Sequence, residues 1–549
     1  MCVTPASIHV KDKVDLTEKE KLIFDCLLQV VQHFNLPTQI RVAGGWVRDK
    51  VLEKECHDID IAVDDMSGRE FCEKVNEYLQ SIGKKTHDIG VSSRKPEQSK
   101  HLEIAVVKLF GVSVDVVNLR SEDYSENSRI PTMRFGGAEE DAYRRDLTIN
   151  SLFYNINTSS VEDLTGRGIA DLKSGKIATP LPPKQTFLDD PLRVLRAIRF
   201  GTRFGFVLDE ELKVAAANID VKAAFEVKIS RERIGKEINL MICGKQPVRA
   251  MTHILELQLF WAVFSLPPEM KTPTWEGCGR HLQLKFLIVC QLKKFKDLFS
   301  SVPSSVLCFL LLCVTYMGSA WRILHLVGRS SFNDDQQRLC LYAALLLPFR
   351  NAACRDKKDK TVPVAHNIIL DSLKLESNDA KTVVRMHAAA EKLLSLIPLI
   401  MSKDDLLFIE ADWKRETIDV SIASKIRILA GCVLREIKEF WRAALVISLL
   451  LYPNDVGLSN EETELIERGE LFKRVENAIL EKGLDKVWEL KPLVDGRGIM
   501  HVLQLDSGGP LVGEWQNKVV EWQLAHPSGS TEECTEWMRR TLTKRTRTE

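Results

Sequence analysis

The first stretch of the chain with a clear hydrophobic pattern lies at residues 12–35. Apolar side chains recur there three and four positions apart, which is the spacing of one face of an α-helix. The residues of this face are Leu22, Phe24, Leu27, Leu28, Val31 and Phe34. We therefore predict an amphipathic helix that precedes the rest of the fold.

The pattern then changes to short apolar runs that are rich in β-branched residues and bounded by turn-forming residues. Runs of this kind are typical of β-strands. The four runs are IRVAGG, HDIDIAV, HLEIAVVKLF and VSVDVVNL, and the segment FCEKVNEYLQSIG between the second and the third has helical spacing. This mixture predicts a compact domain of strands and helices that extends to about residue 155.

Helical periodicity dominates the remainder, beginning at the segment DDPLRVLRAIRFGTRFG. The segment TPLPPKQ just before it is a predicted joint, because prolines cannot continue a helix. Residues 298–321 carry no charge and resemble a membrane span. Their first third is polar, however, and the remaining apolar run is shorter than the ~20 residues that a bilayer requires. We therefore predict a buried core helix there and no membrane association.

The composition is that of a folded protein with several packed units. A chain of 549 residues is too long for one hydrophobic core, which predicts two to four units. The formal net charge is zero, which argues against nonspecific coating of nucleic acid but leaves a local basic strip possible. None of the 13 cysteines forms a CxxC pair or stands at zinc-binding spacing with histidines, so free thiols in a reducing compartment are expected.

The first twenty residues contain neither the apolar segment of a secretory signal nor the acid-poor, arginine-rich pattern of a transit peptide. We therefore expect the protein in the cytoplasm, the nucleus or both. Mitochondrial or plastid targeting would require an upstream extension.

Two carboxylates stand at alternate positions of a predicted strand. Asp58 and Asp60 lie in HDIDIAV, and side chains two positions apart project from the same face of a strand. Such a pair repels itself unless a cation lies between the two groups. Mg²⁺ suits this arrangement, because it prefers one or two carboxylates together with water and substrate phosphates. An exposed acidic strand edge is the alternative explanation for Asp58 and Asp60 taken alone.

The motif GGWVRD, just upstream, supports a phosphate site beside these carboxylates. Gly44 and Gly45 follow the strand IRVA and allow the backbone to approach a phosphate, and Arg48 adds a charged fork for a triphosphate. Together the two motifs resemble the first signature of the DNA polymerase β nucleotidyltransferase superfamily, in its tRNA nucleotidyltransferase branch. In that superfamily a third strand carboxylate often completes the metal site. Asp115 in VSVDVVNL would be that residue, or else a structural aspartate near a strand end.

The segment DAYRRDLTINS, residues 141–151, resembles the second signature of the same family. The resemblance implies that Arg145 holds phosphate or ribose and that Asp146 and Asn150 bond sugar hydroxyls. Asp146 could alternatively cap the helix that begins at Leu147. The segment VEDLTGRGIADLKSGKI resembles the third signature, which joins the family's head domain to its neck.

A further pair of residues is suited to reading a base. Asp190 and Arg193 stand three positions apart on a predicted helix that opens at Pro191, so they are expected to face the same way. Cytosine and adenine each present an amino donor beside a ring-nitrogen acceptor, whereas uracil and guanine present the reverse order. A carboxylate that accepts and a guanidinium that donates would thus admit C and A and reject U and G. Each mismatch would cost ~1–3 kcal/mol in unpaired polar groups.

The same helix carries Arg196 and Arg199, which are placed to meet triphosphate or RNA backbone, or else to form a solvated arginine-rich face. The segment LDDPLRVLRAIRFGTRF resembles the amino-acid template motif of class II CCA-adding enzymes, and Asp189 fits its eukaryotic variant. The segment SRERIGKEI resembles the fifth motif, in which Arg233 and Glu237 would brace the template helix by an ion pair.

The resemblance implies a fold, a domain order and an activity. The fold class is α+β, with a polymerase β-like head followed by an all-α neck, body and tail. The expected domains are an N-terminal helical extension at 1–37, the catalytic head at 38–155, the neck at 156–270 and a tRNA-binding body and tail at 271–549. The implied reaction adds CCA to tRNA from CTP and ATP with Mg²⁺.

Two other classes of function share these motifs. One is a poly(A) polymerase or an enzyme that adds only CC or only A. The other is a noncatalytic tRNA-binding protein built on an inactive head, against which the intact motif residues argue. The sequence does not indicate an oligomeric state.

A row of basic residues in the C-terminal half suggests a surface for tRNA. Arg427, Arg435, Lys438 and Arg442 have spacings of 8, 3 and 4, which would put them on one side of a helix. We predict that this face contributes to tRNA affinity; a solvated helix face is the alternative.

Overall fold

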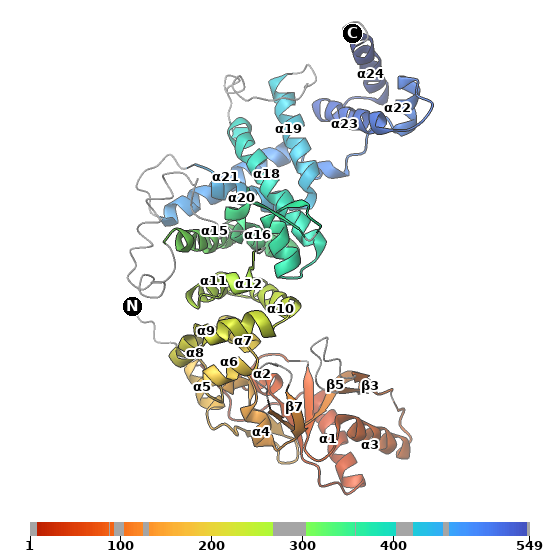
Figure 1. Cartoon of the computed structure of the whole chain (residues 1–549). Helices are drawn as coiled ribbons and strands as arrows, with labels where there is room; N and C mark the ends of the chain where they lie inside the picture. The colour runs from red at the N-terminus through yellow and green to blue at the C-terminus, as the bar shows by residue number, and fades with distance from the viewer. Residues whose placement is uncertain are drawn as a thin grey trace. The chain divides into compact units, whose positions relative to one another are not determined.

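The computed structural model describes residues 8–56, 58–86, 88–92, 104–123, 131–266, 304–356, 358–401, 421–453 and 461–545. The chain divides into two compact units, Met1–Ser265 and Leu266–Glu549 (Figure 1). Unit 1 contains the sheet and the helices that follow it, and unit 2 consists almost entirely of helices. This order agrees with the predicted α+β fold class.

Seven strands of unit 1 form one sheet, in the order β3-β4-β5-β2-β1-β8-β9. Only β2 and β5 run parallel, and the other neighbours are antiparallel. The bounds are β1 (Ile40–Ala43), β2 (Ile59–Val63), β3 (Gly90–Ser92), β4 (Ile104–Leu109), β5 (Val112–Asn118), β8 (Phe153–Asn155) and β9 (Ser160–Glu162). The four predicted strands are β1, β2, β4 and β5. The sequence pattern does not predict the other three, because strands of three residues are too short to show alternation.

The predicted N-terminal helix is α1 (Glu18–His33), which lies beside α3 (Gly68–Ser81) in Figure 1. Thr17 caps α1 in a reciprocal pair of hydrogen bonds with Glu20, so the helix begins six residues later than the predicted range. Its buried face contains Phe24 and Leu27, but Leu22 is 50% exposed, so that part of the predicted apolar face is wrong.

The remaining strands and helices of unit 1 lie between the strands of the sheet or after them along the chain. A separate hairpin is formed by β6 (Arg120–Asp123) and β7 (Thr132–Phe135), and β10 (Lys176–Ile177) pairs with β11 (Val207–Leu208). The helices are α2 (Gly45–Val51), α4 (Ala138–Tyr143), α5 (Gly168–Ser174), α6 (Pro183–Asp189), α7 (Leu192–Phe204), α8 (Glu210–Ala216), α9 (Ile219–Lys228), α10 (Arg231–Ile242), α11 (Pro247–Glu256) and α12 (Phe260–Val263), with a 3-10 turn η2 at Thr148–Asn150. The prolines of the predicted joint stand at the start of α6, and α7 packs against α10 and α11.

The described part of unit 2 contains helices of very different lengths. They are α15 (Ser304–Val327), α16 (Asp334–Leu345), α17 (Val364–Asn367), α18 (Ser377–Met401), α19 (Ile422–Ile437), α20 (Trp441–Leu451), α21 (Glu461–Glu481), α22 (Gly496–Leu503), α23 (Pro510–Ala525) and α24 (Thr531–Arg545). Unit 2 also contains a small hairpin of β12 (Ala353–Arg355) and β13 (Thr361–Pro363).

Among the described residues, one helix is long and apolar enough to cross a membrane. It is α15, and 67% of its most apolar window is buried inside the protein. Helices α16, α20 and α21 pack against it. The predicted reading of this stretch as a core helix therefore agrees with the structure; residues 298–303 of the stretch lie outside the described residues.

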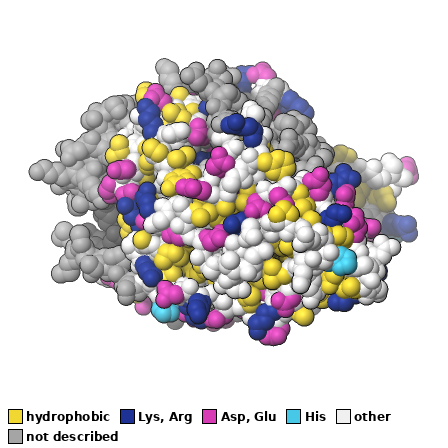
Figure 2. All heavy atoms as spheres, turned by 90° about the horizontal axis from the view of Figure 1, so that it is seen from below, with side chains coloured by type: hydrophobic (Ala, Val, Ile, Leu, Met, Phe, Trp, Pro, Cys, Tyr) yellow, Lys and Arg dark blue, Asp and Glu magenta, His cyan; other side chains and the backbone are white. Residues whose placement is uncertain are grey.

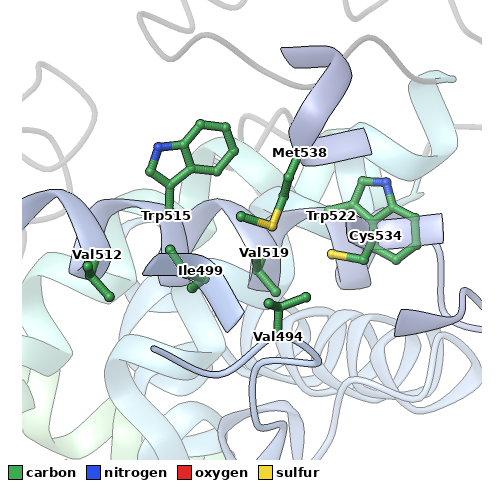
Figure 3. Packing of buried hydrophobic residues seen from close by; sticks show 8 residues of the cluster. All are labelled: Val494, Ile499, Val512, Trp515, Val519, Trp522, Cys534 and Met538. Carbon is green, nitrogen blue, oxygen red and sulfur yellow. The ribbon is translucent and has the colours of Figure 1, made fainter. Parts of the chain in front are cut away.

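The last three helices of unit 2 have a hydrophobic core of their own, shown in Figure 3. Trp515, Val519 and Trp522 of α23 face Ile499 of α22 and Met538 of α24. None of the ten cysteines that the structure describes forms a disulfide bond. On the face drawn in Figure 2, Lys and Arg side chains are interspersed with Asp and Glu, in line with the zero net charge.

The predicted basic row does not form one helix face. Lys438 takes a positive φ of 55° and ends α19, and α20 begins anew at Trp441. Arg427 donates to the main-chain oxygen of Lys482, and Arg435 donates to two main-chain oxygens at 2.7 Å. Arg442 pairs with a glutamate of α21. The single-face prediction is wrong, because the helix breaks within the row and its arginines hold neighbouring segments together.

Candidate active site

Three carboxylates gather on adjacent parallel strands. Asp58 immediately precedes β2 and Asp60 lies within it; both are exposed, whereas Ile59 and Ile61 between and after them are buried. Asp115 of β5 stands directly opposite Asp60 in the parallel pairing of the two strands. The alternation predicted for β2 is therefore present, and the sheet adds the third carboxylate.

Electrostatics show that these groups crowd one another. The pKa of Asp60 is raised, first because the surrounding protein partly removes it from water and then because the Asp115 carboxylate lies near; the Arg145 guanidinium opposes the shift. The pKa of Asp115 is raised by partial burial and by the Asp58 carboxylate. A cation placed among the three would relieve this repulsion.

The donor set fits a hard divalent cation that brings other ligands with it. Among the residues that the structure describes, no group of three or more His, Cys, Asp or Glu side chains is close enough to enclose a metal ion by itself. The set is therefore not a closed structural metal site. Mg²⁺ needs only one or two carboxylates when water and substrate phosphates complete its shell, and Asp58 and Asp60, with Asp115 beside them, meet that requirement.

A glycine turn lies next to the carboxylates. Gly44 has a φ of +67°, and its amide donates to the Leu152 oxygen at 2.8 Å. A Cβ at this position would stand 2.8 Å from Nη1 of Arg145. Gly45 then begins α2. The turn therefore requires glycine at position 44 for both its conformation and its contact with Arg145.

Replacing Gly44 with alanine is expected to cost roughly 1–3 kcal/mol of stability and to reduce activity, because the strained backbone and the new Cβ together displace Arg145. Gly83→Ala is the matched control, since Gly83 has a similar φ of +69° but no atom within 4 Å of the added Cβ. Thermal melting and kcat/KM of both variants would be compared. Equal activity in the two variants would contradict the role given to the Gly44–Arg145 contact.

Arg48 lies deeper than the sequence predicts. It is 3% exposed, and its guanidinium lies over the rings of Phe200 and Phe204, 4.9 and 4.8 Å from their centroids. It donates through Nε to Asp49 at 2.8 Å and through Nη1 to Asn150. Only Nη2 lies near the glycine turn, 3.6 Å from the Cβ position of Gly45. In this structure Arg48 mainly holds α2 against α7, which differs from the predicted free fork for a triphosphate.

Asp146 and Asn150 form a buried link rather than a free pair of sugar ligands. Asp146 accepts from the Leu147 amide at 2.9 Å and from the Asn150 side chain at 3.0 Å, and it pairs with Arg196 at 2.6 Å. Burial alone would raise the pKa of Asp146, but the Arg196 guanidinium and the Asn150 amide bring it to about 2. Asp146 therefore lies just before the η2 turn, whose N-cap Leu147 has no side-chain cap, and its carboxylate is occupied by partners within the protein.

Asp146→Asn is expected to lose roughly 2 kcal/mol of stability at neutral pH, since its pKa falls from 3.8 to about 2 on folding. A depressed pKa stabilises the fold above pH ~4, and this contribution disappears as the pH falls towards 2. Denaturant unfolding at several pH values measures it. Asp220→Asn is the control, because the Lys184–Asp220 pair is about half exposed and should contribute under ~1 kcal/mol. A stability difference that persists unchanged at pH 2 would contradict the assignment.

The predicted base-reading pair lies at the junction of α6 and α7. Asp190 is in an extended conformation just before Pro191, so it precedes the helix instead of sharing it with Arg193. Its carboxylate accepts from the Leu192 amide at 3.2 Å and pairs with Arg233 at 2.9 Å. Arg193 is 7% exposed and donates to the main-chain oxygen of Arg144 at 2.7 Å. The two residues therefore do not share a helix as predicted, although both lie at the start of α7.

Helix α10 braces this junction, as the fifth motif implies. Arg233 holds Asp190, and the buried Glu237 accepts from Arg199 at 2.6 Å. Glu237 also lies 3.9 Å from Arg196. Arg196 and Arg199 are thus fixed by carboxylates of the protein, and Arg196, whose side chain is 35% exposed, is the more accessible of the two.

Asp141, for which the sequence predicts no role, connects Arg145 near the carboxylate cluster with Arg144 near the start of α7. Asp141 is 1% exposed, and its carboxylate contacts Arg144 through Oδ1 and Arg145 through Oδ2, the latter at 2.7 Å. Burial alone would raise the pKa of Asp141, but the two guanidinium groups outweigh it and hold the pKa below its usual range. The spacings i to i+3 and i to i+4 on a short helix could have identified this pairing from the sequence.

The site combines carboxylates suited to a divalent cation, an arginine beside them and the charged groups Asp190 and Arg193 at the start of α7. Comparisons with known proteins agree with this chemistry. Residues 40–178 match the family described as the Poly A polymerase head domain. The chain is 35% identical to the mitochondrial CCA tRNA nucleotidyltransferase of Saccharomyces cerevisiae, covering 97% of this chain and 94% of that protein.

A second relative and a solved structure give the same picture. The mitochondrial CCA tRNA nucleotidyltransferase of Candida glabrata is 34% identical, covering 96% of this chain and 97% of that protein. A solved CCA-adding enzyme in apo form II has a TM-score of 0.60 at 20% identity, covering 96% of each chain. The structural likeness shows a shared fold along nearly the whole chain.

Proposed function

The chain belongs to the family of CCA tRNA nucleotidyltransferases, and from this premise we propose that it adds C, C and A to the 3′ end of tRNA from CTP and ATP. Each addition joins the 3′ oxygen of the RNA to the α-phosphorus of the nucleotide while the bond to pyrophosphate breaks. The structural observation that best supports this function is the cluster of Asp58, Asp60 and Asp115 beside Arg145.

We propose that Asp58 and Asp60, with Asp115 beside them, hold Mg²⁺. When bound, this ion stabilises negative charge on the attacking and leaving oxygens. The chain itself supplies positive charge at the same place, because Arg145 lies near enough to oppose the pKa shift of Asp60. Metal binding is testable apart from activity: Mg²⁺ should raise the melting temperature of the wild type and not that of an Asp60 variant.

We further propose that the start of α7 selects the base. Asp190 would accept from the amino group of C or A, and Arg193 would donate to the ring nitrogen beside it. Arg233 supports this role by orienting Asp190, and the Arg144 oxygen supports it by orienting Arg193. The full set proposed to bind nucleotide is Gly44, Gly45, Arg48, Arg145, Asp146, Asn150, Asp190, Arg193, Arg196 and Arg199. In this set Arg48, Asp146 and Asn150 act chiefly by holding their neighbours.

We also propose an assignment of domains to this chain. Residues 38–155 form most of the catalytic head, although β9 of its sheet lies beyond that bound. Residues 156–270 include the neck that carries α7, and 271–549 are the body and tail that contact tRNA. The N-terminal extension at 1–37 contributes α1, whose Phe24 packs against Trp46 of α2. Removal of α1 is therefore expected to disturb the head.

A direct test of the proposed function compares RNA acceptors. Labelled CTP should be incorporated into tRNA that lacks its last three nucleotides and not into the same tRNA that already ends in CCA. Extension of completed tRNA by many A residues would favour the poly(A) polymerase alternative. Binding of tRNA without incorporation of any nucleotide would favour the noncatalytic alternative.

We propose a cytoplasmic or nuclear pool of this protein together with a mitochondrial one. The mitochondrial pool is supported by the two yeast relatives, both of which are named as mitochondrial. Fractionation of cells with an antibody to the endogenous protein would test both pools. Absence from purified mitochondria would contradict the second.

A further inference from the structure

Asp141 is buried between two parts of the site: the carboxylate cluster with Arg145, and the start of α7 with Arg193. Its Oδ2 accepts from Nε and Nη2 of Arg145, at 3.0 and 2.7 Å, and Arg145 is the guanidinium beside the carboxylate cluster. Its Oδ1 accepts from Nε of Arg144 at 2.8 Å. A single carboxylate on the six-residue helix α4 therefore fixes two successive arginines in different directions.

The Arg144 branch leads to the start of α7. The main-chain oxygen of Arg144 accepts from Nη2 of Arg193 at 2.7 Å. The Arg144 side chain is held a second time by Glu122 of β6, at 3.1 Å, and Glu122 is itself 2.6 Å from Arg120. Because Arg144 is tied by two carboxylates, its main chain offers a fixed acceptor to Arg193.

We propose that Asp141 is a positioning residue that couples base selection to the carboxylate cluster. It orients Arg145 directly, and it orients Arg193 through Arg144. This inference rests on the proposed function. A base that pairs correctly with Arg193 thus meets an arginine whose position depends on the same carboxylate that places Arg145. Asp141 touches neither the base nor the phosphates, and its influence on each passes through a different arginine.

The contacts of Asp141 with Arg145 and with Arg144 predict different kinetic effects. Asp141→Asn keeps the size of the side chain but removes the charge that both arginines need. It should lower kcat through Arg145, and it should also reduce the preference for CTP over UTP about fivefold to tenfold through Arg193. Glu122→Gln weakens only the Arg144 branch. It should therefore reduce the CTP preference by a smaller factor and leave kcat for CTP near that of the wild type.

The test is a double-mutant cycle on a tRNA that awaits its first C, with kcat/KM measured for CTP and UTP. In an Arg193→Ala background, Asp141→Asn should cause no further loss of CTP preference, although it should still lower kcat. Additive losses of preference would overturn the inference, as would an unchanged preference in folded Asp141→Asn protein. If Asp141→Asn does not fold, Glu122→Gln decides: a preference at least threefold lower supports the inference, and an unchanged one overturns it.

The wild type on the same tRNA separates this inference from the proposed function. If the wild type incorporates no CMP, the proposed function fails. If it incorporates CMP and the Arg193→Ala variant keeps full selectivity, base reading by Arg193 fails. If the wild type is selective and Arg193→Ala loses that selectivity, the coupling alone is overturned when folded Asp141→Asn keeps the preference for CTP or when its loss adds to that of Arg193→Ala.

Discussion

Asp60→Ala is expected to reduce kcat/KM for nucleotide incorporation by roughly a thousandfold or more. A metal-assisted displacement derives several kcal/mol of transition-state stabilisation from its cation, and each 1.36 kcal/mol is a factor of ten in rate. Asp60 is an exposed residue within β2, and partial burial and the Asp115 carboxylate raise its pKa, which disfavours its ionised form in the fold. The melting temperature of the metal-free variant should therefore equal or exceed that of the wild type.

This combination of lost activity and retained stability distinguishes a metal ligand from a structural carboxylate. Asp88→Ala is a suitable control, because Asp88 is also an exposed carboxylate of unit 1 but precedes β3, at the far end of the sheet from β1. It should keep full activity. Substantial turnover by Asp60→Ala with Mg²⁺ would remove Asp60 from the site.

The double variant Asp190→Ala, Arg193→Ala is expected to relax base choice as well as slow the reaction. Loss of both side chains removes the favourable bonds to C and A, so kcat/KM for CTP and ATP should fall. It also removes the mismatch that U and G would meet, so the discrimination of a few kcal/mol should shrink. Because Asp58 and Asp60 belong to the sheet and not to α7, chemistry on all four nucleotides should remain measurable.

The measurement is kcat/KM for CTP, ATP, UTP and GTP on a tRNA that awaits its first C. Arg233→Ala provides a graded comparison, since it removes the 2.9 Å partner of Asp190 without deleting the base-reading groups themselves. It should weaken selectivity less than the double variant does. Equal losses for every nucleotide with selectivity for C preserved would mean that other residues read the base, and that α7 serves as a phosphate clamp.

The parts of the site that depend on local periodicity could be predicted from the sequence. Asp58 and Asp60 share an exposed face because side chains alternate along any strand, and the apolar residues between them fix which face is buried. The glycine requirement at position 44 is similarly local. Parallel pairing of β2 with β5, which sets Asp115 against Asp60, could not be read from either strand alone.

The residues whose roles changed are those whose partners lie far away along the chain. Arg48 is engaged by Phe200 and Asn150, and Asp146 by Arg196, at separations of 50 residues or more in sequence. Motif spacing indicates that such residues lie near a nucleotide. It does not show that their hydrogen-bond donors and acceptors already have partners within the protein. The break at Lys438 was also hidden, because neither glycine nor proline marks it.

The most direct test of the central claim is the length of the product made on tRNA that ends at its discriminator base. With CTP alone the wild type should add two nucleotides and stop. With CTP and ATP together it should add three and stop, and with ATP alone it should add essentially none. An A tail of many residues, addition that ends after two nucleotides when both are supplied, or no addition under any condition would contradict the assignment of CCA addition to this chain.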